Sequence, residues 1–231
     1  HLDAAQKHFA ESLEEVQKLA EEGAARLRAL FPAWSVSAET RSGKPAWEIV
    51  EKSDEWQPDL LVVGSHGRSA VGRAILGSVS QKVLHEARCS VRVARKRANR
   101  KDAPVRVLIA VDGSECSEKT VKTADDDPFS RPVVSLIDYM PEGKEDSPAA
   151  KEWIKKIVET PAEILKSAGL KSEHFIRWGE ASGIILSEAK DWQPDTIFIG
   201  ARGLGRFKRF LLGSVSSTVA AKAKCSVEII R

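Results

Sequence analysis

The sequence predicts an α/β protein made of two repeated domains, each built on a doubly wound parallel sheet. Three observations lead to this prediction. Apolar runs of strand length alternate with segments of helical periodicity along most of the chain. Several runs are apolar at consecutive positions, which is typical of parallel strands covered on both faces. A long segment also recurs at a constant offset, and a hydrophobic content of 42% suffices for globular cores.

The repeat is clearest in two short motifs. WQPD occurs at 56–59 and 192–195, an offset of 192 − 56 = 136, and GSVS occurs at 77–80 and 213–216 with the same offset. From Gly43 and Gly179 onward the two copies align without a gap. A period of 136 residues is far longer than the unit of a solenoid, so each copy is expected to be a domain.

The second copy contains the segments of a complete domain. Its strands are expected at 105–111, 132–139, 173–178, 196–199 and 226–230, and its helices at 115–124, 148–168, 181–189 and 214–223. The strands are separated by helices throughout, which is the pattern of a parallel sheet with crossover helices.

The first copy begins with an amphipathic helix at 2–30, the counterpart of the helix at 148–168. Further segments are expected as strands at 34–40, 60–63 and 90–94, and as helices at 45–55 and 78–87. Nothing in this copy matches 105–139, so a strand–helix–strand unit of about 35 residues has no counterpart. We place the first domain at 1–97, a basic linker at 98–103 and the second domain at 104–231.

Composition excludes several classes of protein. Lys plus Arg is 36 and Asp plus Glu is 33, and a net charge of +3 is too small to indicate nucleic-acid binding. The basic linker carries no aromatic residues, so we interpret it as a solvated connection. No apolar run reaches the length of a membrane span, and the first residues do not resemble a signal peptide.

Three cysteines occur without any CxxC or Cys/His cluster, so we expect reduced thiols in the cytoplasm and no zinc site. Cys89 and Cys225, at equivalent places before the last strand of each copy, are interpreted as packing residues.

Two glycine-rich loops carry the chemistry. Each follows an apolar strand and precedes a helix, and both read G-x2-G-x9-G-S, with the glycines at 64, 67 and 77 and at 200, 203 and 213. Glycines after a strand expose backbone N–H groups, and the start of the next helix adds further unpaired donors. The pattern therefore indicates an anion site, although a plain turn is the alternative for either copy taken alone.

Asp112 is the second candidate binding residue, because it ends the strand at 105–111. If that strand lies beside 196–199, Asp112 faces Gly200 across the crevice at the carboxyl ends of the strands. A carboxylate there suits a ribose hydroxyl or the adenine amino group, whereas Asp-Gly-Ser as a helix cap is the alternative. His66 is expected either to approach a phosphate or to face solvent.

No set of residues is placed by spacing as a nucleophile or a general base. We therefore nominate no catalytic residue, and an enzymatic role is left as an alternative, in the form of a weak ATPase or nucleotide transferase.

Together these features resemble the universal stress protein family in its tandem form and its ATP-binding branch. The resemblance rests on VLIAVDGS at 107–114, PDLLVVGSHGR at 58–68 and the two glycine loops, and it covers nearly the whole chain. It implies a five-stranded parallel sheet of order 3-2-1-4-5 in each domain.

The resemblance also implies a bound adenine nucleotide, ATP. The sequence does not decide whether Mg²⁺ accompanies the phosphates, although a bound triphosphate is compatible with it. The resemblance places the nucleoside at Asp112 and the phosphates at Gly200, Gly203, Gly213, Ser214 and Ser216 in the second copy, and at Gly64, Gly67, Gly77, Ser78 and Ser80 in the first. From the same stretches we add four candidate nucleotide-binding residues, Arg202, Val215, His66 and Val79. Members pair through their last strands, so we expect pairing of the two copies within one chain, or a homodimer.

Two departures from the family pattern stand out. Asp138 or Tyr139 takes the place of a small apolar residue beside adenine, and the first copy has no counterpart of Asp112. In the order 3-2-1-4-5, the unmatched unit holds the two middle strands, so the strand at 60–63 is expected to show an open apolar edge. We therefore expect this sequence to be incomplete before His1.

The sequence thus predicts a cytosolic ATP-binding regulatory protein that acts in stress response or signalling. The alternatives are a slow ATP hydrolase on the same fold, or a dimerisation scaffold that holds no nucleotide.

Overall fold

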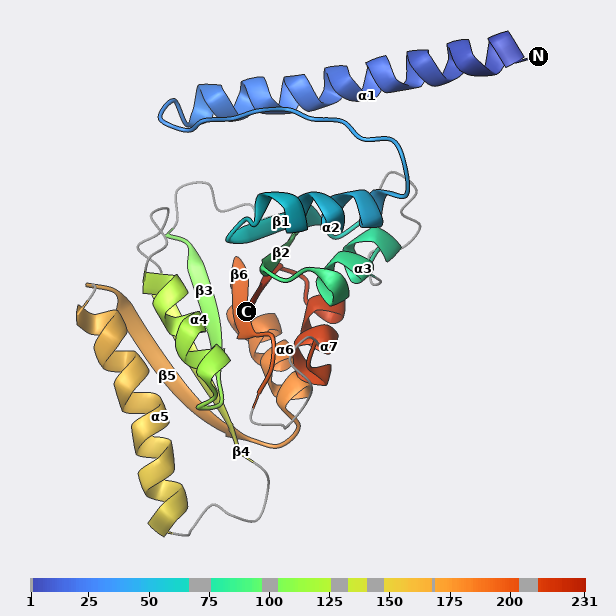
Figure 1. Ribbon diagram of the computed structural model, residues 1–231. Coiled ribbons are helices and arrows are strands. Elements are labelled where there is room, and N and C mark those ends of the chain that lie inside the picture. The colour runs from blue at the N-terminus through green and yellow to red at the C-terminus, as the bar shows by residue number, and fades with distance from the viewer. Residues whose placement is uncertain are drawn as a thin grey trace. The chain divides into compact units, whose positions relative to one another are not determined.

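The computed structural model describes residues 2–66, 76–96, 104–125, 133–140, 148–167, 169–203 and 212–231 (Figure 1). It divides into two compact units, His1–Ile49 and Val50–Arg231. The helix α2 (Pro45–Trp56) runs across this division in the sequence. We describe each unit by itself.

The first unit consists of the long helix α1 (Leu2–Leu30) and the chain that runs back along it (Figure 1). Arg28 donates two hydrogen bonds from its guanidinium to the Val36 carbonyl, at 3.1 and 2.9 Å, and Thr40 donates to the Gln17 side chain at 2.7 Å. These bonds hold the returning segment against the helix.

The strand predicted at 34–40 is wrong, because these residues form no strand. In the second repeat the equivalent strand β5 (Lys171–Trp178) is held by β4 (Val133–Met140). The first repeat of this sequence has no counterpart of β4, and a strand without a hydrogen-bonding neighbour is not stable. The segment therefore bonds to α1 instead.

The second unit is built on a seven-stranded sheet of order β1-β2-β7-β6-β3-β4-β5. The remaining strands are β1 (Leu60–Gly64), β2 (Ser90–Ala94), β3 (Arg106–Val111), β6 (Thr196–Gly200) and β7 (Ser226–Ile230). Neighbouring strands are parallel except β2 and β7, which are antiparallel. The five strands of the second repeat follow the order 3-2-1-4-5, and the last strands of the two repeats pair within the chain.

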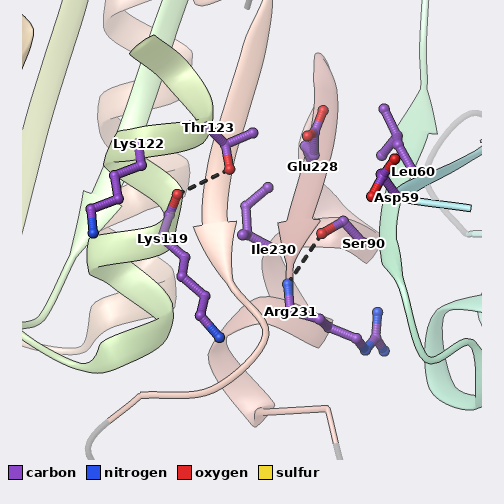
Figure 2. Close-up of a pocket in the computed structure, with 9 residues that line it drawn as sticks. All are labelled: Asp59, Leu60, Ser90, Lys119, Lys122, Thr123, Glu228, Ile230 and Arg231. Atoms are coloured by element: carbon purple, nitrogen blue, oxygen red, sulfur yellow. Dashed lines mark hydrogen bonds between the residues drawn. The ribbon is translucent and has the colours of Figure 1, made fainter. Parts of the chain in front are cut away.

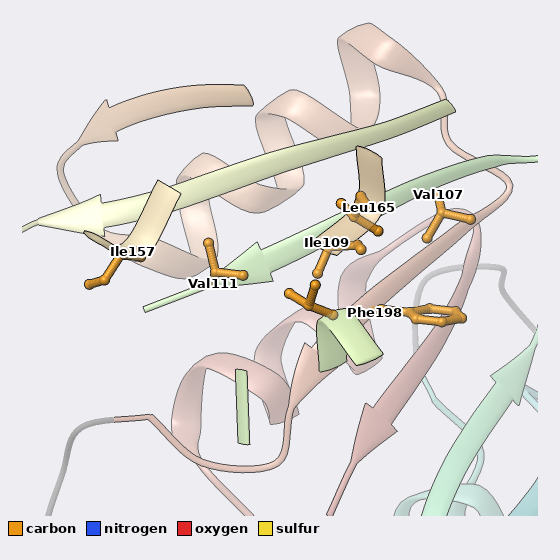
Figure 3. Packing of buried hydrophobic residues seen from close by; sticks show 7 residues of the cluster. Val107, Ile109, Val111, Ile157, Leu165 and Phe198 are labelled. Carbon is orange, nitrogen blue, oxygen red and sulfur yellow. The ribbon is translucent and has the colours of Figure 1, made fainter. Parts of the chain in front are cut away.

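The helices of this unit are α3 (Ser78–Glu86), α4 (Glu115–Asp125), α5 (Pro148–Ser167), α6 (Ala181–Trp192) and α7 (Ser214–Lys222). Side chains from α4 and α5 join β3 and β6 in one buried cluster (Figure 3), formed by Val107, Ile109, Val111, Val121, Ile157, Leu165 and Phe198. On the opposite face of β3, Leu108 and Ala110 are buried as well. Both faces of the central strand are therefore covered, as a doubly wound sheet requires.

The equivalent strands β1 and β6 of the two repeats differ in burial. All five residues of β6 are buried, whereas β1 lies at the end of the sheet and leaves Leu60 and Val62 at 36% and 57% exposure. The expected open apolar edge at 60–63 is thus confirmed. In the part of the chain that the structure describes, no helix is long and apolar enough to cross a bilayer.

Candidate functional site

The second glycine loop begins where β6 ends and is tied to the sheet and to α7. Ala201 donates its N–H to the Ile230 carbonyl at 2.7 Å, and Gly213 donates to the Ala201 carbonyl at 2.8 Å. The two ends of the loop, Gly200 to Gly203 and Gly213, therefore lie together although nine residues separate them in the sequence.

The N-terminus of α7 faces this loop without a side-chain cap. Its N-cap residue, Gly213, has φ −66° and ψ 151° and no side chain with which to bond the first turn. The adjacent helix α6 is different: Glu180 accepts from the N–H groups of Ser182 and Gly183 at 2.9 and 2.7 Å. These bonds lower the pKa of the Glu180 carboxyl. Compared with α6, helix α7 leaves the donors of its first turn available to an external anion.

Ser214 and Ser216 differ in what their hydroxyls can do. Ser216 is buried and donates to the Ala201 carbonyl at 3.0 Å and to that of Gly213 at 3.2 Å, so its hydroxyl proton already holds the loop. Ser214 is exposed at the start of the helix. The hydroxyl of Ser214 is therefore the one of the two that is better placed to meet a ligand.

Asp112 lies on the opposite side of this loop. Strand β3 runs parallel to β6, with Ala110 opposite Ile199, so Asp112 leaves the sheet beside the end of β6. A Cβ atom added at Gly203 would lie only 2.3 Å from Asp112 Oδ2. A side chain at 203 would have to displace this carboxylate, so the Asp112 carboxylate borders the loop directly.

The turn at 112–114 is fixed by its own hydrogen bonds. Asp112 Oδ1 accepts from the Ser114 N–H at 3.0 Å, and Gly113 adopts φ +75°. Ser114 in turn donates its hydroxyl to the Arg202 carbonyl at 3.3 Å. Ser114 was not among the predicted site residues, although the Asp-Gly-Ser motif signalled a turn at this place.

Gly200 has a packing role that the sequence did not show. A Cβ atom at this position would lie 2.8 Å from the Cβ of Cys116, the second residue of α4. The absence of a side chain at Gly200 therefore lets α4 approach the end of β6 and brings the 112–114 turn close to the loop.

The first glycine loop repeats most of this geometry. Gly77 donates to the Ser65 carbonyl at 2.9 Å, and the hydroxyl of Ser80 donates to the Gly64 carbonyl at 2.6 Å. Gly77 caps α3 with φ −64° and ψ 150°, again without a side-chain bond. Ser78 is exposed and Ser80 is buried, as in the second repeat.

His66 belongs to the first loop and stands where the second has Arg202. Its Nδ1 lies 3.0 Å from the Ser65 hydroxyl, and its Nε2 is buried with no hydrogen-bond partner among the described residues. The ring is thus partly buried rather than fully turned to solvent.

Some predicted residues lie outside the described ranges. They are Gly67 and the linker at 98–103. Asp138 is described by its backbone, and it pairs with Val111 in the sheet, next to Asp112.

A cavity of about 500 Å³ lies elsewhere in this unit, between α4 and the strands β1, β2 and β7 (Figure 2). Its lining is mixed in charge and contains Asp59, Leu60, Ser90, Lys119, Lys122, Thr123, Glu228, Ile230 and Arg231. None of these residues belongs to either glycine loop, so this cavity is not the predicted nucleotide site. Within the described ranges, no three His, Cys, Asp or Glu side chains are grouped as a metal site.

Comparison with known proteins identifies the family. The model of the universal stress protein family matches residues 2–95 and 105–231. A universal stress protein of Mycolicibacterium smegmatis is 30% identical over 244 residues, which cover 100% of this chain and 79% of that protein. One of Mycobacterium tuberculosis is 30% identical over 237 residues, with coverages of 93% and 74%.

A solved structure shows the same fold. The crystal structure of a universal stress protein from Archaeoglobus fulgidus superposes with a TM-score of 0.70 at 24% identity, covering 97% of this chain and 79% of the other. The family model matches the chain twice, and the relatives are similar over nearly its full length. Both findings agree with the two glycine loops and with the order of the strands in the sheet. The chain belongs to the universal stress protein family.

Proposed function

We propose that this protein binds an adenine nucleotide, ATP, at the second glycine loop and acts as a cytosolic regulatory protein in stress response or signalling. One observation carries the proposal. The Asp112 carboxylate and the glycine-capped N-terminus of α7 border the same loop. The carboxylate lies so close to Gly203 that a Cβ atom there would be 2.3 Å from Asp112 Oδ2.

The two sides of the loop suit the two ends of a nucleotide. The first-turn N–H groups at Ser214, Val215 and Ser216, together with the loop from Gly200 through Arg202 to Gly203, suit the phosphates. Asp112 repels phosphate and suits a ribose hydroxyl or the adenine amino group. Mg²⁺ beside the phosphates would offset their charge.

Binding without rapid hydrolysis is the activity that we propose. The hydroxyl of Ser216 is committed to loop carbonyls, and Asp112 Oδ1 is committed to the Ser114 N–H. Neither of these two oxygen atoms is free to act as a base for an attacking water. The nucleotide would act through its presence, by nucleotide-dependent conformation or partner binding.

The first loop, with Gly64, His66, Gly67, Gly77, Ser78, Val79 and Ser80, is a weaker candidate for the same ligand. It has the phosphate half of the site and no carboxylate at the place of Asp112. A scaffold role is the second candidate function for the first repeat, and the pairing of β2 with β7 favours it because this contact joins the two repeats.

The direct test is to denature the purified protein and identify any released nucleotide by chromatography and mass spectrometry. ATP that is retained, together with saturable binding in calorimetric titration, is the expected result. ADP or AMP formed at catalytic rates would favour an enzyme. A protein without nucleotide, and without measurable affinity for ATP, would favour the scaffold.

A further inference from the structure

The contact between the last strands of the two repeats is organised about one pair of residues. In the antiparallel pairing of β2 and β7, Arg92 faces Glu228, and the flanking pairs are Val91 with Ile229 and Val93 with Val227. Arg92 and Glu228 differ by 228 − 92 = 136, the repeat offset, so they are equivalent positions that face each other. A local two-fold axis relating the repeats therefore passes between these two residues.

Other contacts across this axis occur twice, once in each direction. The Arg95 guanidinium donates to the carbonyls of Ala220 and Cys225 at 2.6 and 3.2 Å. Its equivalent, Arg231, donates to those of Leu84 and Cys89 at 2.6 and 3.1 Å. Each arginine thus satisfies carbonyls at the end of the other repeat's helix, where the helix dipole is negative.

The backbone repeats this reciprocity. The N–H of Arg95 donates to the Ser226 hydroxyl at 3.0 Å, and the N–H of Arg231 donates to the Ser90 hydroxyl at 3.2 Å (Figure 2). These contacts use Arg, Ser and Cys residues that are the same in both repeats. They would form equally well between two copies of one repeat, so they give strength to the pairing and no selectivity.

The residues on the axis are different, because they carry opposite charges. Arg92 Nε donates to Glu228 Oε2 at 2.5 Å, and the guanidinium also lies 5.7 Å from the centre of the Phe198 ring. The Glu228 side chain is 3% exposed and that of Arg92 is 32% exposed. A carboxylate as buried as this one requires a counter-charge.

We infer that the opposite charges of Arg92 and Glu228 make strand pairing selective. The last strand of each repeat pairs with the last strand of the other repeat and not with a second copy of itself. In a pairing of two second repeats, Glu228 would face the same residue of the other copy, so that two buried carboxylates would meet in place of the Arg92–Glu228 pair. In a pairing of two first repeats, two guanidinium groups would meet. Like charges directly opposite each other in a sheet are destabilising.

The partner for this surface is therefore the other repeat, and the shared strand edge is closed to a homodimer of like repeats. This inference does not depend on nucleotide binding, because none of the residues on the axis belongs to a glycine loop. The selectivity comes from the Arg92–Glu228 pair, because Arg95 and Arg231 make the same contacts in both directions and cannot distinguish the repeats.

The test reverses each charge separately and then both together. R92E places two carboxylates on the axis, E228R places two guanidinium groups there, and R92E/E228R restores opposite charges. R88E is the matched control: Arg88 is 74% exposed and pairs with Asp54 at 3.6 Å, away from the axis. Thermal unfolding is measured for all four proteins in their full-length form.

Each single reversal is expected to lower the first unfolding midpoint by roughly 5–10 °C, and R88E by at most about 2 °C. The double reversal is expected to recover at least about half of the loss. If the double variant is no more stable than the weaker single variant, the site requires particular residues rather than opposite charges, and the inference fails. Should a single reversal not fold, folding of the double variant supports the inference and its failure to fold overturns it.

A second measurement reports the pairing itself. V91C and I229C introduce two facing cysteines, and their disulfide, identified by peptide mass spectrometry, forms only when β2 lies against β7 in this register. The yield is expected to fall at least about threefold with either single reversal and to return with the double. An unchanged yield in both single reversals would show that the charges do not select the partner.

Discussion

The described ends of the two glycine loops, 64–66 with 76–78 and 200–203 with 212–214, have similar hydrogen bonds and differ in what stands opposite to them. Each is closed by a bond from the glycine before the helix, 2.9 Å in the first repeat and 2.8 Å in the second, and the N-cap angles agree within a few degrees. Among the described residues, an aspartate borders the second loop and not the first, since Asp112 follows β3. In the nucleotide site that we propose, the phosphate half would therefore be local to the loop and helix, whereas the nucleoside half would come from a neighbouring strand.

The largest expected effect tests whether the second loop is the principal site. Gly203→Val places a side chain between the loop and Asp112, where a Cβ alone would lie 2.3 Å from a carboxylate oxygen. We expect the affinity for ATP, measured by titration calorimetry, to fall at least about 100-fold.

The control is Gly67→Val, the equivalent change in the first repeat, which should leave the tight binding unchanged. Thermal unfolding of both variants separates lost binding from lost folding. Unchanged affinity in a folded Gly203→Val protein would reject the second loop as the site.

The next effect sharpens the contrast in stability. A methyl group at Gly200 would lie 2.8 Å from Cys116 Cβ, whereas at Gly64 the nearest atom, the His66 carbonyl oxygen, is 3.5 Å away. We expect Gly200→Ala to reduce the free energy of unfolding by about 1–3 kcal/mol and Gly64→Ala to change it by less than about 0.5 kcal/mol. Denaturant titration measures both, and equal losses would show that α4 does not depend on this close approach.

A smaller effect concerns the charge of Asp112. Asn in its place keeps an oxygen that can accept from the Ser114 N–H, so the turn should persist while the negative charge is lost. If the carboxylate bonds the nucleoside, Asp112→Asn should weaken ATP binding roughly tenfold. Tighter binding would instead mean that Asp112 faces the phosphates and that its assigned role is wrong.

The helices and most strands followed from the sequence because their patterns are local. The helix at 2–30 and the strands at 90–94 and 226–230 have the predicted bounds, and the other helices differ by at most three residues at an end. The segment at 34–40 has a strand-like pattern, but forming a strand depends on a neighbour, which the first repeat does not supply.

The candidate site could likewise be predicted only where it depends on local patterns or on general rules of sheet topology. The placement of Asp112 beside the second loop followed from a general property of parallel strands. The close contact of Gly200 with Cys116, and the bonds of Arg95 and Arg231 to the opposite repeat, join residues 84 or more positions apart. No local pattern encodes such contacts, because they depend on how the sheet is assembled.

The last and smallest effect compares Cys89 with Cys225, two residues at equivalent positions. Burial raises the pKa of both thiols, and for Cys225 it does so to about 11. At pH 8 about one in a thousand Cys225 side chains is then a thiolate, the form that reacts with iodoacetamide. We expect Cys225 to be alkylated slowly and Cys89 to react faster, as measured by peptide mass spectrometry. The alkylation rate of Cys225 is expected to rise about tenfold per pH unit up to about pH 11.

Denatured protein, in which both thiols should react alike, is the control. Equal rates in the folded protein would mean that the two thiols are equally accessible at the start of the last strands. The difference between the repeats would then be limited to the exposure of β1 and to the presence of Asp112 beside the second loop.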